Sequence, residues 1–230
     1  THKTSSAASD VYKRQGLRRV IREEENGEIT VIANNYNNKK LNSPNDVAVS
    51  KLGNIWFTDP PYGILTNQEG HKSESEQDGN NLFMVDKDFK IKKINAKFDK
   101  PNGLAFSPNG KYLYVADSGA ANPGNFDLSR PHNIQVFELD DEENIISNKI
   151  FAEINDGFPD GMTVDVNVNV FVCDPNGEKI HIFESSSNYI GNINIPERVA
   201  NCTFGGENKT DLYITASTSL FRIKTLTQGL

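Results

Sequence analysis

One pattern recurs along this chain and constrains its fold more than any other feature. It consists of a proline, an amide or carboxylate residue, an alternating apolar run, a Gly or Asn turn, and a second apolar run that ends in aspartate. The pattern occupies Ser43–Asp59, Lys100–Asp117 and Phe158–Asp174, and a more divergent copy lies at Val199–Thr215. The same local structure is therefore expected at four places in the chain.

The segments inside and between these copies are short apolar runs with a period of two, separated by turn residues, which predicts antiparallel strands. Leu17–Arg22 and Ile29–Asn34 flank the dipeptide Asn26-Gly27, a strong signal for a hairpin turn. No segment of helical length carries a 3.6-residue apolar stripe. The sequence therefore predicts an all-β protein.

Four-stranded units that repeat every ~40 to 58 residues are typical of a β-propeller, in which the blades pack radially around a central channel. A sandwich or a barrel would also contain many short strands, but it would not require the same polar residue at the same place in each copy. The last unit offers three strands and Gly16–Asn34 only two. The chain is expected to hold about four blades of a larger ring, with an N-terminal portion absent.

The first residues differ from the rest. Thr1–Gln15 is rich in Ser and Ala, lacks the strand periodicity and has no apolar core of the kind that a secretory signal requires. This segment is predicted to be unstructured or a foreign junction, so that residues 16–230 form the propeller domain.

Composition excludes some partners. The net charge is −7, and no basic stripe stands out among the 24 Lys and Arg residues, which argues against nucleic acid. No run approaches the roughly 18 apolar residues of a membrane span, so a soluble globular protein is expected, with its compartment and oligomeric state left open. Cys173 and Cys202 lie in predicted inner strands. They are expected to be buried free thiols, and a disulfide or metal pair is the alternative.

The candidate functional residues come from the register of the repeat. Asn45, Asn102 and Asp160 occupy one equivalent position, 57 and 58 residues apart, and each follows a proline at the start of an inner strand. Equivalent positions of successive blades converge on the propeller axis, and three oxygen donors there would suit Ca²⁺, Mg²⁺ or Mn²⁺. The competing interpretation is that Pro-Asn-Gly and Pro-Asp-Gly are simply good turns. Asn201 lies one residue out of register and is expected to line the channel without ligating.

The repeat contains aspartates at two positions, one before the inner strand and one at the end of the second strand. Asp160 is the only carboxylate in the aligned set, so it is a candidate metal ligand, a candidate general base that activates water, or both. Asp59, Asp117 and Asp174 close the second strand of each copy. They either line the opposite end of the channel or cap blade turns through hydrogen bonds to the backbone.

A long polar insertion, Tyr62–Asn81, separates two predicted strands. Loops longer than about 12 residues in compact domains are often lids or binding loops, and disorder is the alternative. Tyr62 and His71 on this insertion are candidate substrate contacts, whereas His132 and His181 are expected to be surface or strand residues. Neither a nucleophilic-serine motif nor a phosphate-binding glycine loop occurs.

Several stretches together resemble the gluconolactonase branch of the senescence-marker protein/gluconolactonase/luciferin-regenerating family. They are Leu41–Val47, Trp56–Ile64, Pro101–Pro108, Pro159–Met162, Asn201–Gly206 and Leu212–Ala216. The resemblance extends from Gly16 to about Ile223. It implies a six-bladed propeller and a divalent-cation-dependent lactone hydrolase, most often with Ca²⁺, and with Zn²⁺, Mn²⁺ or Mg²⁺ as alternatives.

By the same resemblance, Asn102 and Asp160 match metal ligands, Asp160 also matches a general base, Asn45 matches a position that contacts metal or substrate, and the insertion is a lid. The family supplies a glutamate ligand from its first inner strand, and no matching Glu-Gly-Pro motif occurs here. The expected function is a hydrolase that opens a sugar lactone. The alternatives are a paraoxonase- or phosphotriesterase-like hydrolase, and a non-catalytic binding propeller or inactive fragment.

Overall fold

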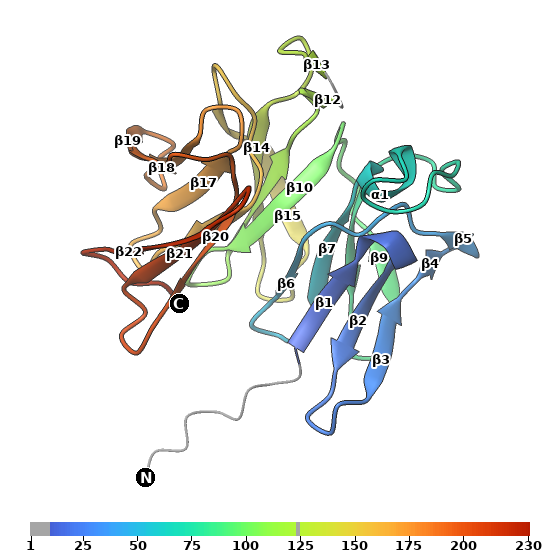
Figure 1. Ribbon diagram of the computed structural model, residues 1–230. Helices are drawn as coiled ribbons and strands as arrows, with labels where there is room; N and C mark the ends of the chain where they lie inside the picture. Colours follow the sequence, from blue (N-terminus) through green and yellow to red (C-terminus); the bar gives the residue numbers. More distant parts are fainter. Residues whose placement is uncertain (1–9, 123–124) are drawn as a thin grey trace. The chain divides into compact units, whose positions relative to one another are not determined.

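The computed structural model describes residues 10–122 and 125–230 (Figure 1). Its regular structure in these ranges is almost entirely β, with the short helices η1 (Gln15–Leu17) and α1 (Tyr62–Leu65) as the helical elements. The chain divides into two compact units, one up to Lys97 and one from Phe98 onward. No helix in the described ranges is long and apolar enough to cross a membrane.

The first unit contains two antiparallel meanders and a small hairpin. One meander is β1 (Asp10–Arg14), β2 (Arg19–Glu23) and β3 (Ile29–Ala33), and the hairpin is β4 (Asn35–Tyr36) with β5 (Lys39–Lys40). The second meander has four strands: β6 (Val47–Val49), β7 (Ile55–Asp59), β8 (Asn81–Val85) and β9 (Ile91–Lys93). The turn predicted at Asn26-Gly27 is confirmed, because Gly27 has a φ of 82° between the paired strands β2 and β3.

The second unit contains three meanders. The first is β10 (Pro101–Phe106), β11 (Tyr112–Asp117), β14 (Asn133–Leu139) and β15 (Ile145–Glu153), with the hairpin β12 (Ala121–Asn122) and β13 (Asn125–Phe126) inserted. The next is β16 (Met162–Val164), β17 (Val170–Asp174), β18 (Lys179–Phe183) and β19 (Tyr189–Asn194). The last has the three strands expected from the sequence, β20 (Val199–Gly205), β21 (Asp211–Ala216) and β22 (Leu220–Lys224).

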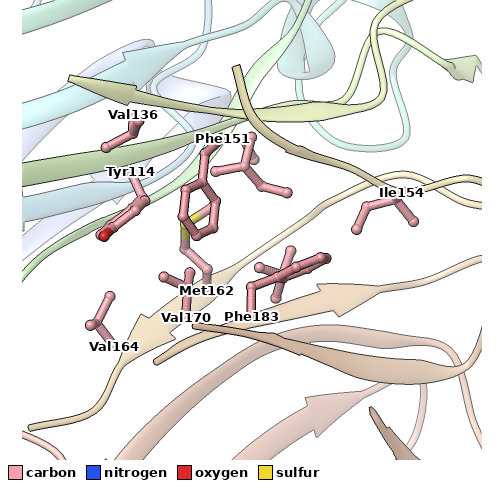
Figure 2. Packing of buried hydrophobic residues seen from close by; sticks show 11 residues of the cluster. Tyr114, Val136, Phe151, Ile154, Met162, Val164, Val170 and Phe183 are labelled. Carbon is pink, nitrogen blue, oxygen red and sulfur yellow. The ribbon is translucent and has the colours of Figure 1, made fainter. Parts of the chain in front are cut away.

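Neighbouring meanders bury their apolar faces against each other. Figure 2 shows Tyr114 and Phe151 of one sheet facing Met162 and Val170 of the next, with the Tyr114 and Phe151 rings 4.9 Å apart edge to face. Each such fully buried side chain stabilises the fold by about 1.5–3 kcal/mol. The second strands β7 and β17 are buried at every residue. Both faces of β17 are covered, because Val170 and Val172 lie in one apolar cluster and Phe171 and Cys173 in another. Antiparallel meanders of three or four strands that stack face to face are typical of propeller blades, so the predicted all-β propeller class is confirmed.

The start of the described chain departs from expectation. Residues 1–15 were predicted to have no regular structure, but Asp10–Arg14 forms β1 and pairs with β2 from Asp10↔Glu23 to Arg14↔Arg19. The pairing arises because β2 would otherwise present an open edge with free backbone donors and acceptors. Residues 1–9 lie outside the described part.

Candidate active site

The residues that the repeat singled out lie in or just before the first strands β6, β10 and β16. Pairing between first and second strands places Val47 opposite Phe57, Leu104 opposite Val115 and Met162 opposite Val172. Two residues before these first-strand anchors stand Asn45, Asn102 and Asp160. The predicted equivalence of the three positions is therefore confirmed at the level of strand register.

In the fourth copy, Asn201 is shifted by one residue relative to the other three positions, as the sequence indicated. Cys202 pairs with Ile214, and the residue two positions before Cys202 is Ala200, so Asn201 stands one position further along. The Asn201 side chain accepts the Cys202 N–H at 2.8 Å, and its own N–H donates to Thr215 Oγ1 at 3.2 Å. Asn201 therefore has a local structural role at the end of its strand.

The turn interpretation of Pro-Asn-Gly and Pro-Asp-Gly is wrong. Pro101–Phe106 is strand throughout, and Asp160 donates its N–H to Cys173 O at 2.8 Å, as Asn45 does to Thr58 O at 2.9 Å. Neither Gly103 nor Gly161 has the positive φ that a glycine-requiring turn demands. Asn102 and Gly103 lie in β10, and Asp160 and Gly161 lead into β16 with backbone hydrogen bonds to Cys173. The glycine in the motif therefore needs another explanation.

The glycines allow the inner strands of the second unit to approach each other closely. A Cβ on Gly103 would lie 2.3 Å from the Asp160 carbonyl oxygen, and a Cβ on Gly161 would lie 2.2 Å from Asn201 Cγ. Gly161 also donates its N–H to Ala200 O at 2.8 Å, a direct backbone bond between neighbouring blades. The glycines that follow Asn102 and Asp160 are therefore required by contact with the next blade.

The chemistry available at these strand ends is that of hard oxygen donors. In the second unit, the amide of buried Asn102 and the carboxylate of half-buried Asp160 stand at equivalent places on β10 and just before β16, which are neighbours. Within residues 10–122 and 125–230, no group of three or more His, Cys, Asp or Glu side chains could hold a metal ion. Any cation here would thus rely on mixed amide and carboxylate oxygens, which is a ligand set that Ca²⁺ accepts. Asn45 holds the equivalent place in the first unit.

The closing aspartates position the segments that lead into the inner strands. Asp59 accepts the N–H groups of Asn42 and Ser43, each at 2.8 Å, and Asp117 accepts those of Asp99 and Lys100 at 2.9 and 2.8 Å. Asp174 does the same for Phe158 at 3.3 Å and also contacts His181 Nε2 at 3.2 Å. Of the two roles considered, the cap through side-chain to backbone hydrogen bonds is the one observed.

Burial shifts the titration of Asp59. Desolvation raises the pKa of this carboxyl from 3.8 to about 7, although the two N–H donors and the charge of Arg18 act to lower it. Desolvation likewise raises the pKa of Asp117. For Asp174, burial acts to raise the pKa, but the bonds from His181, Gly177 and Phe158 together outweigh it and the pKa is lowered.

A pH-dependent contribution to stability follows for Asp59. The folded chain binds more protons at this group than the unfolded chain between pH of about 4 and 7, so its stabilisation falls as pH rises through that window. We expect the free-energy difference between the parent and Asp59→Asn to change by roughly 4 kcal/mol across it. Urea unfolding at several pH values measures the difference. A difference that stays constant from pH 4 to 7 would contradict the expectation.

The insertion after β7 packs against its own first residues and against the segment that precedes Asn45. It starts with α1, and then His71 and Ser73 donate their N–H groups to Gly63 O and Ile64 O, both at 3.0 Å. Ser75 Oγ donates to Asn42 Oδ1 at 2.6 Å, so the loop reaches the residues that precede Asn45. The segment is thus packed rather than disordered. Tyr62 is half-buried, and His71 is exposed on the loop.

His132, His181 and the two cysteines have structural roles. His132, just before β14, has its Nδ1 2.9 Å from Ile154 O, and His181 in β18 pairs with Asp174. Cys173 and Cys202 are buried free thiols, which confirms that interpretation. They come from neighbouring blades, and hydrogen bonding with Cys202 together with burial raises the pKa of the Cys173 thiol. Their contact was not visible in the sequence.

Comparison with known proteins agrees with this architecture. Residues 9–218 match the family described as the SMP-30/Gluconolactonase/LRE-like region. The gluconolactonase of Zymomonas mobilis is 37% identical over 210 residues, which are 87% of this chain and 55% of that protein. The curated relatives are matched over only 55% to 60% of their length.

Solved structures share the fold. A gluconolactonase from Xanthomonas campestris superposes with a TM-score of 0.81 at 30% identity, covering 93% of this chain and 67% of that one. A calcium-binding protein, regucalcin, from Agrobacterium tumefaciens superposes with a TM-score of 0.73 at 17% identity, covering 98% and 75%. The family match spans nearly all of the described blades, and the chain belongs to the SMP-30/gluconolactonase/LRE-like family.

Proposed function

We propose that this chain carries the catalytic residues of a hydrolase that opens a sugar lactone to its hydroxy acid. The observation that carries the proposal is the pair Asn102 and Asp160, held at equivalent places on neighbouring inner strands that only glycine allows to meet. The similarity to gluconolactonases at 37% and 30% identity supports the substrate class. Lactone opening needs a polarised carbonyl and an activated water, and oxygen-rich sites suit both.

The donor set also fits a divalent cation. Amide and carboxylate oxygens are the ligands of hard cations, and the similar regucalcin is a calcium-binding protein, so Ca²⁺ is the first choice, with Zn²⁺, Mn²⁺ and Mg²⁺ as alternatives. Asn102 and Asp160 of the second unit would hold it, and Asn45 is the residue at the equivalent register position of the first unit. When bound, such a cation supplies Lewis-acid polarisation of the lactone carbonyl.

The chain's own side chains then carry the proton transfers. Asp160 accepts a proton from the attacking water while the water oxygen bonds to the carbonyl carbon. The bond between that carbon and the ring oxygen breaks, and the proton passes to the ring oxygen, which becomes the new hydroxyl. Asn45, Tyr62 and His71 are proposed to bind the sugar hydroxyls, since an amide, a phenol and an imidazole all donate and accept hydrogen bonds.

The proposed function is tested with gluconolactone and an assay of acid release, with the spontaneous hydrolysis rate subtracted. We expect a chelator to lower the enzymatic rate roughly a hundredfold or more, because carbonyl polarisation contributes several kcal/mol. Added Ca²⁺, Mn²⁺, Zn²⁺ or Mg²⁺ should restore the rate. Turnover that persists unchanged after chelation would refute the cation, and no turnover with any of the four cations would refute the lactonase.

A further inference from the structure

A cavity of about 420 Å³ lies in the first unit, between the start of β2, the β4–β5 hairpin and the insertion. Its polar lining is Arg18, Asn34, Lys40, His71 and Ser73. A volume of this size is within the range of small-molecule pockets. Two cationic side chains and three neutral ones that can donate hydrogen bonds make the lining rich in donors.

Arg18 is the most constrained of these residues. Its Nε donates to Leu41 O at 2.6 Å, and its Nη1 donates to Ser73 Oγ at 3.3 Å, with the side chain only 15% exposed. Its Nη2 is shielded from solvent and has no hydrogen-bond partner among the residues the structure describes. A shielded guanidinium donor without an acceptor is destabilising, because it has lost its hydrogen bonds to water. Arg18 also has a φ of 53°, an uncommon conformation for a residue with a side chain.

The side chains around the cavity carry a net positive charge, which favours binding of an anion. Glu76 is the carboxylate that faces Arg18: its Oε1 lies 3.6 Å from Arg18 Nη1, and its Oε2 accepts the Lys40 N–H at 2.9 Å. Glu69 and Glu74 on the same insertion do not line the cavity. Asp59 also interacts with Arg18, and its pKa is raised to about 7, so it carries only part of a negative charge at neutral pH. Arg18 and Lys40 therefore contribute two positive charges against Glu76 and the partial charge of Asp59.

We infer that this cavity binds an oxyanion group, a carboxylate or a phosphate, of a small polyol. The Arg18 guanidinium and the Lys40 ammonium would bind the anionic oxygens, since charge-assisted bonds from guanidinium to such groups are strong. Asn34, His71 and Ser73 would bind neighbouring hydroxyls. A sugar acid is the product class of the proposed lactone opening, but the binding can be measured without turnover. Failure of either proposal therefore leaves the other standing.

Calorimetric titration of the chain with gluconate, inorganic phosphate and glucose tests the inference. We expect gluconate or phosphate to bind and neutral glucose not to bind, and we expect binding to weaken as NaCl is raised. Binding of gluconate alone identifies a carboxylate ligand, and binding of phosphate alone identifies a phosphate ligand. If neither anion binds, or if glucose binds as tightly, the inference is wrong.

Two variants and a matched control locate the binding. Arg18→Gln and Lys40→Gln should each raise the Kd about tenfold or more, as expected for loss of one charge-assisted contact. Lys39→Gln should leave the Kd unchanged, because Lys39 is the exposed neighbour of Lys40 on β5 and does not line the cavity. If Arg18→Gln fails to fold because Leu41 loses its donor, Lys40→Gln still decides. Equal affinity in Lys40→Gln and Lys39→Gln would overturn the assignment.

Discussion

Replacing Asp160 by asparagine is expected to lower kcat for lactone opening by about 10²–10⁴-fold, the usual contribution of a positioned general base. Asparagine keeps the size of the side chain and one oxygen, but its amide nitrogen cannot accept a proton. The backbone bond from Asp160 N–H to Cys173 O does not depend on the side chain, so the strand should form normally. Steady-state kinetics with gluconolactone measure the loss.

A matched control and a second readout separate catalysis from stability. Asp156 is an exposed aspartate in the same loop, and Asp156→Asn should keep full activity. Asp160→Asn should also weaken Ca²⁺ binding in calorimetry, because a carboxylate becomes a neutral amide at a proposed ligand position. Full activity in Asp160→Asn would remove this residue from the mechanism. Equal losses in both variants would point to a general charge effect.

Replacing Gly103 by alanine is expected to destabilise the second unit by about 3 kcal/mol or more, at the upper end of overpacking costs. The added Cβ would lie 2.3 Å from the Asp160 carbonyl oxygen and 2.7 Å from Gly161 Cα. Both neighbours are backbone atoms of the next blade, so no rotamer change can relieve the collision. Urea unfolding measures the loss, and the displaced Asp160 should reduce turnover as well.

The control for this substitution is another glycine without such a neighbour. At Gly79 the nearest atom to an added Cβ is Asn81 Oδ1 at 4.0 Å, and its φ is not in the left-handed region. Gly79→Ala should change the free energy of unfolding by no more than about 0.5 kcal/mol. If Gly103→Ala unfolds at the same urea concentration as Gly79→Ala, the inner strands do not approach as closely as described.

Much of the fold could be predicted because strand patterns are local. The alternation of apolar residues and the turn dipeptides predicted the hairpin of β2 and β3 and the three-stranded last meander. The equivalence of Asn45, Asn102 and Asp160 was also predictable, because each stands two residues before an apolar strand anchor. Each copy of a repeat keeps the same spacing between the polar residue and the strand, and this spacing does not depend on how the blades are arranged.

Local patterns also misled. The apolar alternation alone predicts a strand over Val168–Val172, but β17 starts at Val170. Val168 instead has a φ of 65° in a turn where Asp165 Oδ1 accepts the N–H groups of Asn167 and Asn169 at 2.9 and 2.7 Å. The aspartate competes successfully for the backbone donors, which apolar periodicity does not register.

The sequence by itself determined the all-β class, the blade repeat and which oxygen-bearing residues start the inner strands, because these depend on spacing within about 20 residues. Only the tertiary structure decided why glycine follows the candidate ligands, that Cys173 meets Cys202, and that Arg18 joins Lys40 and His71 around one cavity. Each of these depends on contacts between residues about 20 to 60 positions apart. Such contacts are determined by the packing of one element on another, and no periodicity along the chain encodes them.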